Sequence, residues 1–240
     1  MRMTVAIILT ILMLSCQDSS FEGGKENVEA QKPEPQTDNL TPESPTDPLV
    51  TNVDIVAADT SIDTEKLFVE CLVGAVEGVY PMKALLYQLP VDTALLPDFA
   101  TMTPVKKVCL RQLDISNRDF SQGFPGVENL FEWFALDIRF KLLVPEDGSY
   151  TFSINSDDGS KVYIDGALLI NNDGQHGQEE LSGIASLSAG LHDVKVEYFQ
   201  GPRFKIALEL FWQSDKIAKS FIPPENIKIS NDPVFDQIPN

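Results

Sequence analysis

Short stretches of alternating apolar and polar residues recur from Leu67 onward, with turn residues between them. Gly, Asn and Asp occupy these turns, for example in Asp157-Asp158-Gly159 and Asp165-Gly166, and they allow tight reversals at low cost. No long stretch places apolar residues at helical spacing. The pattern therefore predicts an all-β fold, either an antiparallel sandwich or a barrel. The predicted strands are 67–73, 83–88, 107–115, 133–144, 149–155, 161–165, 167–170, 183–187, 191–199, 204–213 and 226–229.

The balance of charges narrows the classes of partner. The 240 residues include 18 Lys and Arg and 36 Asp and Glu, which gives a formal net charge of −18. Nucleic acids and anionic membrane surfaces bind proteins through basic patches, so we expect neither as a partner. Such an acidic chain suits a solvated surface protein or one that holds cations. Apolar residues make up 43% of the chain, which is enough for a packed core.

Residues 1–15 have the features of a bacterial signal peptide. Arg2 supplies a positive start, and residues 5–14 form an almost unbroken apolar run that is too short to span a bilayer stably. The following Ser15-Cys16 resembles the lipobox of bacterial lipoproteins, which implies that Cys16 becomes the lipidated N-terminus. An ordinary signal peptide with cleavage nearby is the alternative, and the lipoprotein is favoured.

The lipoprotein resemblance also implies a place in the cell envelope, anchored to a membrane by the lipid. The residue after Cys16 is Gln17, whereas an aspartate retains lipoproteins in the inner membrane of enteric bacteria. This difference favours the outer membrane.

Residues 16–66 are predicted to be a disordered tether. The part from 17 to 50 contains eight acidic residues and five prolines, with Phe21 as its single aromatic residue. A segment of this composition cannot bury enough apolar surface to offset the entropy of ordering. The globular domain is predicted over residues 67–232, and residues 233–240 are a C-terminal tail.

Two cysteines remain after Cys16, namely Cys71 and Cys109. An even pair in an oxidising compartment is typical of a disulfide, here with a sequence separation of 38 (109 − 71). Two buried free thiols are the alternative, because the sequence gives no distance between them. The disulfide is slightly favoured.

The predicted hairpin that carries Asp157-Asp158 belongs to a longer pattern. The chain contains VPEDGSYTFSINSDDGSKVYIDGALLINNDGQHG, then GIASLSAGLHDVKVEYFQGPRFKIALELFWQ, then IPPENI. These elements, in this order, resemble the PA-14 domain, a module of bacterial surface proteins, glycosidases and yeast adhesins. The resemblance covers about residues 130–226 and extends more weakly upstream to about Gly78. It implies a β-sandwich.

The resemblance also implies a metal site. In the adhesins of this family, a cis peptide joins the two aspartates of the hairpin tip, and both bind a Ca2+ ion that bridges sugar hydroxyls. By position, Asp157 and Asp158 are the expected calcium ligands, and Ca2+ prefers oxygen ligands. The adhesins supply a third ligand, an asparagine, from the loop between the last two long strands. Gln200 is the nearest equivalent in this chain. Arg203 of the same loop is a further candidate for ligand binding, and a surface charge with no such role is the alternative. This loop lacks the longer segment that contacts sugar in the adhesins.

The polar loop with Asn172, Asp173 and His176 supplies further candidates for ligand binding, provided that it lies near the hairpin tip. A turn punctuated by glycine is the alternative and is favoured. The two aspartates have a structural alternative as well, since one can accept backbone N–H bonds in the turn while the other is solvated. The two histidines, His176 and His192, lack the spacing of a zinc site.

These observations predict a non-catalytic, lectin-like module for carbohydrate binding and adhesion, displayed on a lipoprotein of the cell envelope. Ca2+ is the expected cofactor, and a glycan or cell-surface polysaccharide is the expected partner. The sequence has no GxSxG motif, no Cys/His nucleophile pattern and no phosphate-binding loop, so we do not expect an enzyme. The alternative function is a structural or protein-interaction module of the envelope that binds neither sugar nor metal.

Overall fold

The computed structural model describes residues 68–71, 79–122 and 131–238. Within these ranges the regular structure consists of antiparallel β-strands and four short 3-10 helices, and it includes no helix of the length and apolarity that a membrane span requires. The signal peptide, Cys16 and the tether lie outside the described residues and stay predictions. The strands are β1 Phe68–Glu70, β2 Met82–Gln88, β3 Lys106–Leu110, β4 Asp114–Asp119, β5 Phe134–Val144, β6 Gly148–Asp157, β7 Ser160–Ile164, β8 Ala167–Asn172, β9 Glu179–Leu187, β10 Gly190–Gln200, β11 Lys205–Gln213, β12 Ser220–Phe221 and β13 Ile227–Ile229.

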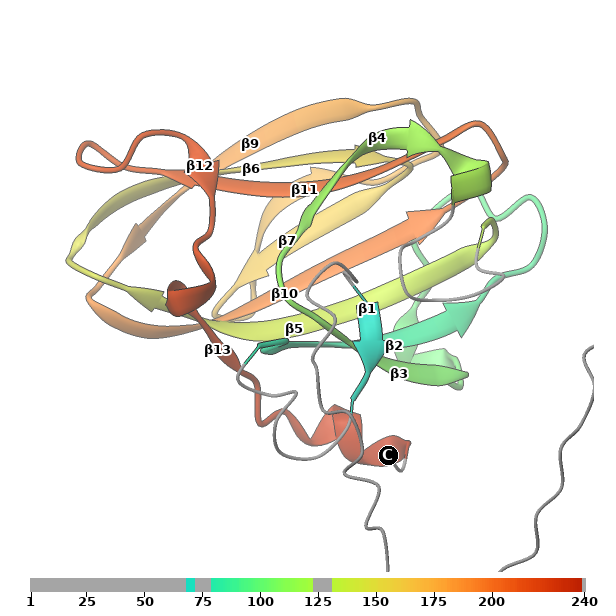
Figure 1. Cartoon of the computed structure of the whole chain (residues 1–240), viewed down its shortest axis with the longest axis horizontal. Helices are drawn as coiled ribbons and strands as arrows, with labels where there is room; N and C mark the ends of the chain where they lie inside the picture. The colour runs from blue at the N-terminus through green and yellow to red at the C-terminus, as the bar shows by residue number, and fades with distance from the viewer. Residues whose placement is uncertain (1–67, 72–78, 123–130, 239–240) are drawn as a thin grey trace, which may run out of the picture. The chain divides into compact units, whose positions relative to one another are not determined.

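The described strands form two sheets that lie face to face, as Figure 1 shows. Sheet A has the order β1-β3-β2-β5-β10-β7-β8, and β13 also pairs with β5. Sheet B has the order β12-β11-β6-β9, and β4 also pairs with β11. The longest pairing joins β5 to β10 over their full lengths, from Gly190 opposite Val144 to Gln200 opposite Phe134. The antiparallel β-sandwich predicted from the sequence is therefore confirmed.

Alternation along the strands produces the core between the two sheets. In β5, Leu136, Ile138 and Phe140 are buried between the sheets, whereas Arg139 and Lys141 lie on the outer face of sheet A. Tyr150 and Phe152 of β6 supply the opposite wall of the same core from sheet B. Side chains two residues apart share one face of a strand, so these alternating sequences can bury one face of each sheet.

Two strand predictions were wrong in detail. The stretch 107–115, predicted as one strand, forms β3 and the start of β4, which belong to different sheets. Leu110 ends the pairing with β2, and Asp114 begins the pairing with β11. The two polar residues Arg111 and Gln112 shift the phase of the apolar alternation between Leu110 and Leu113, and the sequence prediction overlooked this signal of the break. The two-residue strand β12 was not predicted, because so short a strand has no readable pattern.

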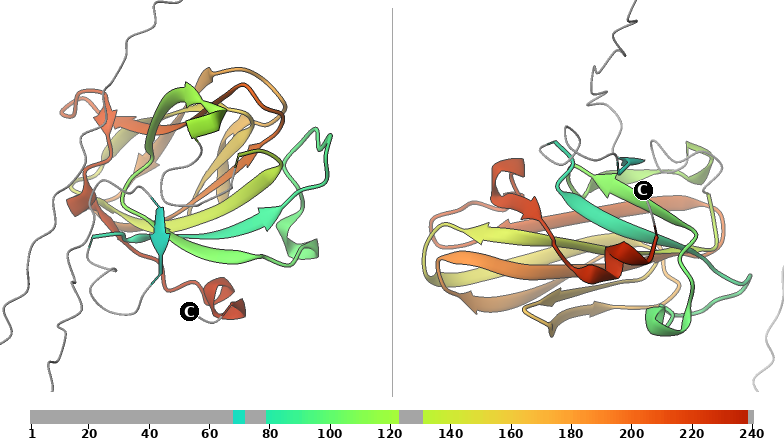
Figure 2. Two further views of the ribbon diagram at one scale, coloured as in Figure 1. Left: turned by 45° about the vertical axis from the view of Figure 1, so that its right-hand side comes forward. Right: turned by 90° about the horizontal axis from the view of Figure 1, so that it is seen from below.

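A second apolar cluster covers the outer face of sheet A near the C-terminus. Phe235 is 3% exposed and packs in a cluster with Leu85, Tyr87 and Phe199. It belongs to the 3-10 helix η4 (Pro233–Gln237), which lies below sheet A in the left view of Figure 2 and in front of the strands in the right view, seen from below. Lys107 donates to the carbonyl oxygen of Ile238 at 3.1 Å. The segment assigned to a tail therefore packs against the domain as far as Ile238.

The structure joins Cys71 to Cys109 in a disulfide, with Cα atoms 5.1 Å apart. Cys109 lies in β3, and the neighbouring strand β1 pairs Val69 with Cys109. This register brings the chain near Cys71 alongside β3, which is the pairing that the sequence favoured.

Candidate functional site

Loops from both sheets meet at the end of the sandwich where β2, β6, β8 and β10 finish. The register shows this directly, since Gln88, the last residue of β2, lies opposite Phe134, and Phe134 lies opposite Gln200. At the same end, Ser160 of β7 pairs with Asn172, the last residue of β8. The hairpin tip with Asp157 and Asp158 is therefore surrounded by the loops after β8 and β10.

Asp157 is a buried carboxylate, 8% exposed, and a cis peptide joins it to Asp158. Burial raises the pKa of Asp157 to about 6, and the negative charge of Asp158 adds to this effect. The charge of His176 and the backbone amide of Gln178 act in the opposite direction. Within the described part of the chain, no lysine or arginine forms an ion pair with Asp157. Asp157 therefore lies in surroundings that favour a compensating positive charge.

Asp158 is 5% exposed and is held by backbone amides from two loops. The N–H of His176 donates to Oδ1 at 3.1 Å, and the N–H of Gly201 donates to Oδ2 at 2.8 Å. Burial raises the pKa of Asp158, and these two N–H bonds offset part of the rise. Oδ1 keeps a second lone pair, whereas Oδ2 also faces the amide nitrogen of Gln200 at 3.3 Å, so Asp158 can still bind a cation through Oδ1.

Two glycines allow this close packing. A Cβ atom on Gly159 would lie 2.4 Å from Phe199 and 2.7 Å from the backbone nitrogen of Gly174. A Cβ atom on Gly201 would lie 3.2 Å from Oδ2 of Asp158. The roles of the Gly201 and His176 amides could not be predicted from the sequence, because every residue except proline carries a backbone donor. The glycine at 201 is the one signal that could have pointed to such an approach.

The contacts of Gln200 do not favour the role of third ligand that the resemblance implied, which stays a prediction. Its side-chain oxygen accepts a hydrogen bond from Tyr198 Oη at 2.6 Å. Its Nε2 faces three acceptors, namely Asp158 Oδ2 at 3.3 Å and the carbonyl oxygens of Pro202 and Lys205. The opposite orientation of the amide would place its oxygen against those acceptors, so the network assigns the nitrogen to that side. Gln200 is fully buried and positions Asp158 as a hydrogen-bond donor.

The loop after β8 lies near the hairpin tip, but its side chains face other partners. Asn172 donates to Ser156 Oγ and to the carbonyl oxygen of Glu179, both at 3.2 Å. Asp173 accepts from the N–H of Leu96 at 2.8 Å and forms an ion pair with Lys161 at 2.6 Å. This loop therefore contributes backbone amides to the site, and the prediction of Asn172 and Asp173 as ligand-binding side chains is not supported by these contacts.

The ring of His176 also points to backbone groups. Its Nδ1 lies 2.8 Å from the carbonyl oxygen of Gly177, and its Nε2 lies 3.0 Å from that of Asn172. Desolvation lowers the pKa of His176, but the two carbonyl oxygens and the nearby Glu179 and Asp158 raise it by more, so the net shift is upward. Both ring nitrogens donate only in the charged form, which leaves no free lone pair for a metal ion.

The side chain of Arg203, in the loop after β10, contacts Glu132 and Phe120 rather than either of the two aspartates. Its Nε is 3.3 Å from the carboxylate of Glu132, and its guanidinium lies 5.6 Å from the ring centre of Phe120. The side chain is 67% exposed, so this pair is weak and the arginine can reorient.

The described residues contain no group of three or more His, Cys, Asp and Glu side chains that is arranged to hold a metal. A cation at the hairpin tip would therefore have two carboxylates as its side-chain ligands, from Asp157 and Asp158. Both are buried and adjacent, neither forms an ion pair with a described lysine or arginine, and oxygen ligands of this kind suit Ca2+. The remaining ligands would be backbone oxygens, water or hydroxyl groups of a bound molecule.

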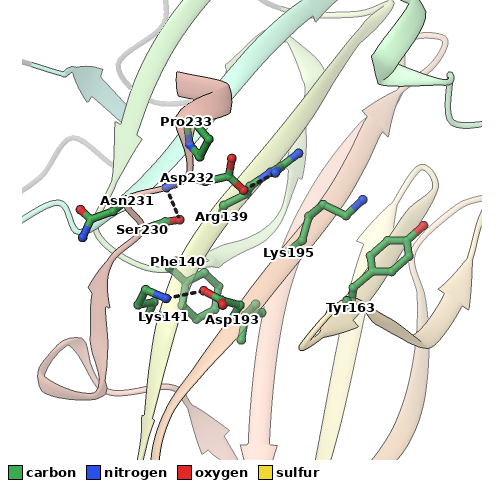
Figure 3. Close-up of a pocket in the computed structure, with 12 residues that line it drawn as sticks. Arg139, Phe140, Lys141, Tyr163, Asp193, Lys195, Ser230, Asn231, Asp232 and Pro233 are labelled. Atoms are coloured by element: carbon green, nitrogen blue, oxygen red, sulfur yellow. Dashed lines mark hydrogen bonds and ion pairs between the residues drawn. The ribbon is translucent and has the colours of Figure 1, made fainter. Parts of the chain in front are cut away.

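A separate groove lies on the outer face of sheet A, where Figure 3 shows Arg139 and Lys195 between Tyr163 and the segment Ser230–Pro233. It contains neither Asp157 nor Asp158. The hairpin tip and this groove are therefore distinct candidate sites.

In a comparison with protein families, residues 119–226 match the sequence model of the PA14 domain. Among curated proteins, the anti-sigma-I factor RsgI3 of Acetivibrio thermocellus is 36% identical over 117 residues, which are 48% of this chain and 18% of that protein. The chain therefore spans less than a fifth of the length of this relative.

Two solved structures share the fold. An anti-sigma factor domain-containing protein matches with a TM-score of 0.53 and 24% identity, over 68% of this chain and 50% of that one. A PA14 sugar-binding domain from an RTX adhesin matches with a TM-score of 0.52 and 15% identity, over 63% of this chain and 99% of that one. At these identities the likeness concerns the fold alone.

Proposed function

We propose that this chain, which contains a PA14 domain over residues 119–226, binds carbohydrate at its hairpin tip with the help of Ca2+. The observation that carries the proposal is the pair of adjacent, buried carboxylates of Asp157 and Asp158, with which no lysine or arginine among the described residues forms an ion pair. The solved PA14 domain with the same fold that is described as sugar-binding is consistent with this proposal.

In this mechanism Asp157 and Asp158 hold the ion. When bound, Ca2+ supplies a positive charge and coordination positions that vicinal hydroxyl groups of a sugar can fill. The N–H groups of His176 and Gly201 and the amide of Gln200 hold the carboxylate of Asp158 in place. The protein orients the ligand and performs no bond chemistry, so the proposed module is non-catalytic.

We also propose the location of the module. The lipobox-like Ser15-Cys16 supports a lipid anchor in the bacterial cell envelope, on the outer membrane, and residues 16–66 would be the tether. The anchor is tested by metabolic labelling with a fatty acid, which should mark the chain and fail to mark Cys16→Ser.

Calcium-dependent binding is tested first by thermal melts in EDTA and in rising Ca2+. A site that binds only the folded protein adds about 2.7 kcal/mol at a hundredfold excess over Kd. We expect this stabilisation in the wild type and its loss in Asp157→Asn. The matched control is Asp215→Asn, an exposed aspartate in the loop after β11, which should respond as the wild type does. Identical melts of the wild type with EDTA and with millimolar Ca2+ would exclude the calcium site.

Sugar binding is tested next, on a glycan array with Ca2+ and with EDTA. We expect spots that require both Ca2+ and an intact Asp157. Calcium binding without any such spot would leave a metal site but exclude the lectin function.

The alternative function, a protein-interaction module, is favoured by exposed apolar side chains. Val91 is 68% exposed, Leu95 57% and Phe204 78%. In the loop after β8, the side chain of Gln175 donates to the carbonyl oxygen of Thr93, and Asp173 accepts from the N–H of Leu96. Phe204 lies in the loop after β10. These residues therefore belong to the same end of the sandwich as Asp157. Binding to an envelope protein that is unchanged by EDTA and lost in Phe204→Ala would support this alternative.

A further inference from the structure

The groove on the outer face of sheet A has a volume of about 410 Å3. This lies within the range of about 300–1,000 Å3 that is typical of sites for small ligands. Arg139 and Lys141 of β5 and Lys195 of β10 form its floor. Tyr163 of β7 stands on one side and the segment Ser230–Pro233 on the other, as Figure 3 shows.

Ion pairs hold the floor of the groove in place. Arg139 donates from Nε and Nη2 to both oxygens of Asp137, at 2.9 and 2.6 Å, and it also pairs with Asp232 from the opposite wall. Lys141 pairs with Asp193 at 2.6 Å. The paired groups come from β5, β10 and the segment after β13, so these contacts fix the wall relative to the floor.

Lys195 of the floor and Tyr163 of the side are held together by shared contacts. Lys195 Nζ lies 2.6 Å from Glu197 and 4.0 Å from the ring centre of Tyr163. The hydroxyl of Tyr163 donates to the second oxygen of Glu197 at 3.0 Å. These two side chains and Glu197 therefore fix one another's positions, which reduces the entropy that a ligand must overcome on binding.

The charges of the groove cancel almost completely. Three cations, Arg139, Lys141 and Lys195, face carboxylates from four acids, namely Asp137, Asp193, Glu197 and Asp232. No excess positive charge remains to attract an anion, and the chain as a whole carries −18. What the groove offers is a set of fixed donors and acceptors, which suits a ligand with many hydroxyl groups and no charge.

From this arrangement we infer a second carbohydrate site, in which the groove between Tyr163 and Ser230–Pro233 binds a neutral polysaccharide without calcium. The site contains none of the residues of the hairpin tip, so it does not depend on the proposed calcium site. A chain with both sites would contact two stretches of one polysaccharide or two different glycans.

The test is affinity electrophoresis in native gels that contain EDTA, because the acidic protein migrates well under these conditions. The neutral probes are galactomannan, xyloglucan and mixed-linkage glucan, and polygalacturonate serves as the anionic probe. We expect at least one neutral polysaccharide to retard the wild type and Asp157→Asn equally. Lys195→Met and Asn231→Ala should each bind about tenfold more weakly, because each variant loses about one hydrogen bond to the polysaccharide.

The matched control is Lys219→Met. Lys219 also forms an ion pair, with Glu180, and lies 4.7 Å from an aromatic ring, that of Phe211, but it belongs to the region of sheet B. It should bind as the wild type does, and circular dichroism should show all variants folded. The inference is overturned if no neutral probe retards the wild type in EDTA, if polygalacturonate alone does so, or if Lys195→Met and Asn231→Ala bind normally.

Discussion

The backbone N–H of Gly201 donates a hydrogen bond of 2.8 Å to Oδ2 of Asp158, a residue 43 positions earlier in the chain. The preceding residue, Gln200, directs its amide nitrogen to the same carboxylate oxygen at 3.3 Å. The orientation of Asp158 is therefore controlled by the loop after β10. A metal ion bound by Asp158 would depend on that loop even though the loop supplies no carboxylate.

Replacing Gln200 by Met should lower stability and weaken calcium binding together. The methionine cannot donate to Asp158 or to the carbonyl oxygens of Pro202 and Lys205, and Tyr198 loses a partner. Loss of buried hydrogen bonds of this kind costs about 1–3 kcal/mol. Urea denaturation in EDTA should show the cost, and Gln213→Met, a partly exposed glutamine at the far end of β11, should show much less.

Calcium titrations of Gln200→Met also distinguish whether Gln200 positions Asp158 or itself binds the ion. A positioning residue should leave calcium binding weakened but measurable, because Asp157 and Asp158 remain. Complete loss of the calcium response, equal to that of Asp157→Asn, would show that Gln200 is itself a ligand.

The stability of the calcium-free protein should fall as pH rises from about 4 to about 6. Burial, followed by the charge of Asp158, raises the pKa of Asp157 from 3.8 to about 6, so in this interval the folded state keeps a proton that the unfolded state has lost. Stability from this group is therefore present below the unfolded pKa and lost as pH rises through the folded one. Thermal melts in EDTA across this interval should show the decline, and Asp157→Asn should reduce its slope.

Calcium binding should have the opposite dependence on pH. The ion requires the ionised carboxylate, so protons compete with it and the apparent Kd should increase as pH falls below about 6. Calorimetric titrations at several pH values measure this directly. A Kd that does not change across this interval would mean that Asp157 is not a ligand.

Phe235→Ala should destabilise the domain by about 3–5 kcal/mol, the usual cost of truncating a buried phenylalanine. The side chain is 3% exposed and packs on the outer face of sheet A with Leu85 and Tyr87. Phe204→Ala is the matched control, since Phe204 is 78% exposed and its removal should change the free energy of unfolding little. Equal stabilities of the two variants in denaturant would contradict the packing of η4.

Removing the disulfide should lower stability by a few kcal/mol. Cys71 and Cys109 are 38 positions apart in the sequence, and the chain-entropy estimate for a loop of this size is about 3–4 kcal/mol. The double variant Cys71→Ser/Cys109→Ser should unfold at lower denaturant than the oxidised wild type. The wild type in reductant is the control, and it should match the variant; a difference between them would point to an effect of the serines themselves.

The strands and the hairpin tip could be predicted from the sequence because both depend on local rules. Residues such as Leu136, Ile138 and Phe140 alternate with polar ones, and this period of two marks a strand with one buried face. Gly159 and Gly166 mark the turns that begin and end β7. The PA14 resemblance then identified Asp157 and Asp158 as the paired acids of the tip.

The roles of Gln200, Asn172, Asp173 and Arg203 could not be predicted in the same way. Each has a side chain that suits a ligand, but the partner it contacts depends on the register of strands far apart in sequence. Arg203 meets Glu132, 71 positions away, and Asp173 accepts from Leu96, 77 positions away. The change of sheet between β3 and β4 depends in the same way on distant residues, since the pairing partners of Leu110 and Asp114 lie in different sheets.

By itself, the sequence determined that this chain forms antiparallel strands with two adjacent aspartates in a turn. Only the tertiary structure decided that these aspartates are buried, that amides of His176 and Gly201 hold one of them, and that Gln200 is a donor. The physical reason is that alternation and turn propensity belong to neighbouring residues, whereas burial and hydrogen-bond partners arise when the loops after β8 and β10 pack on the hairpin tip.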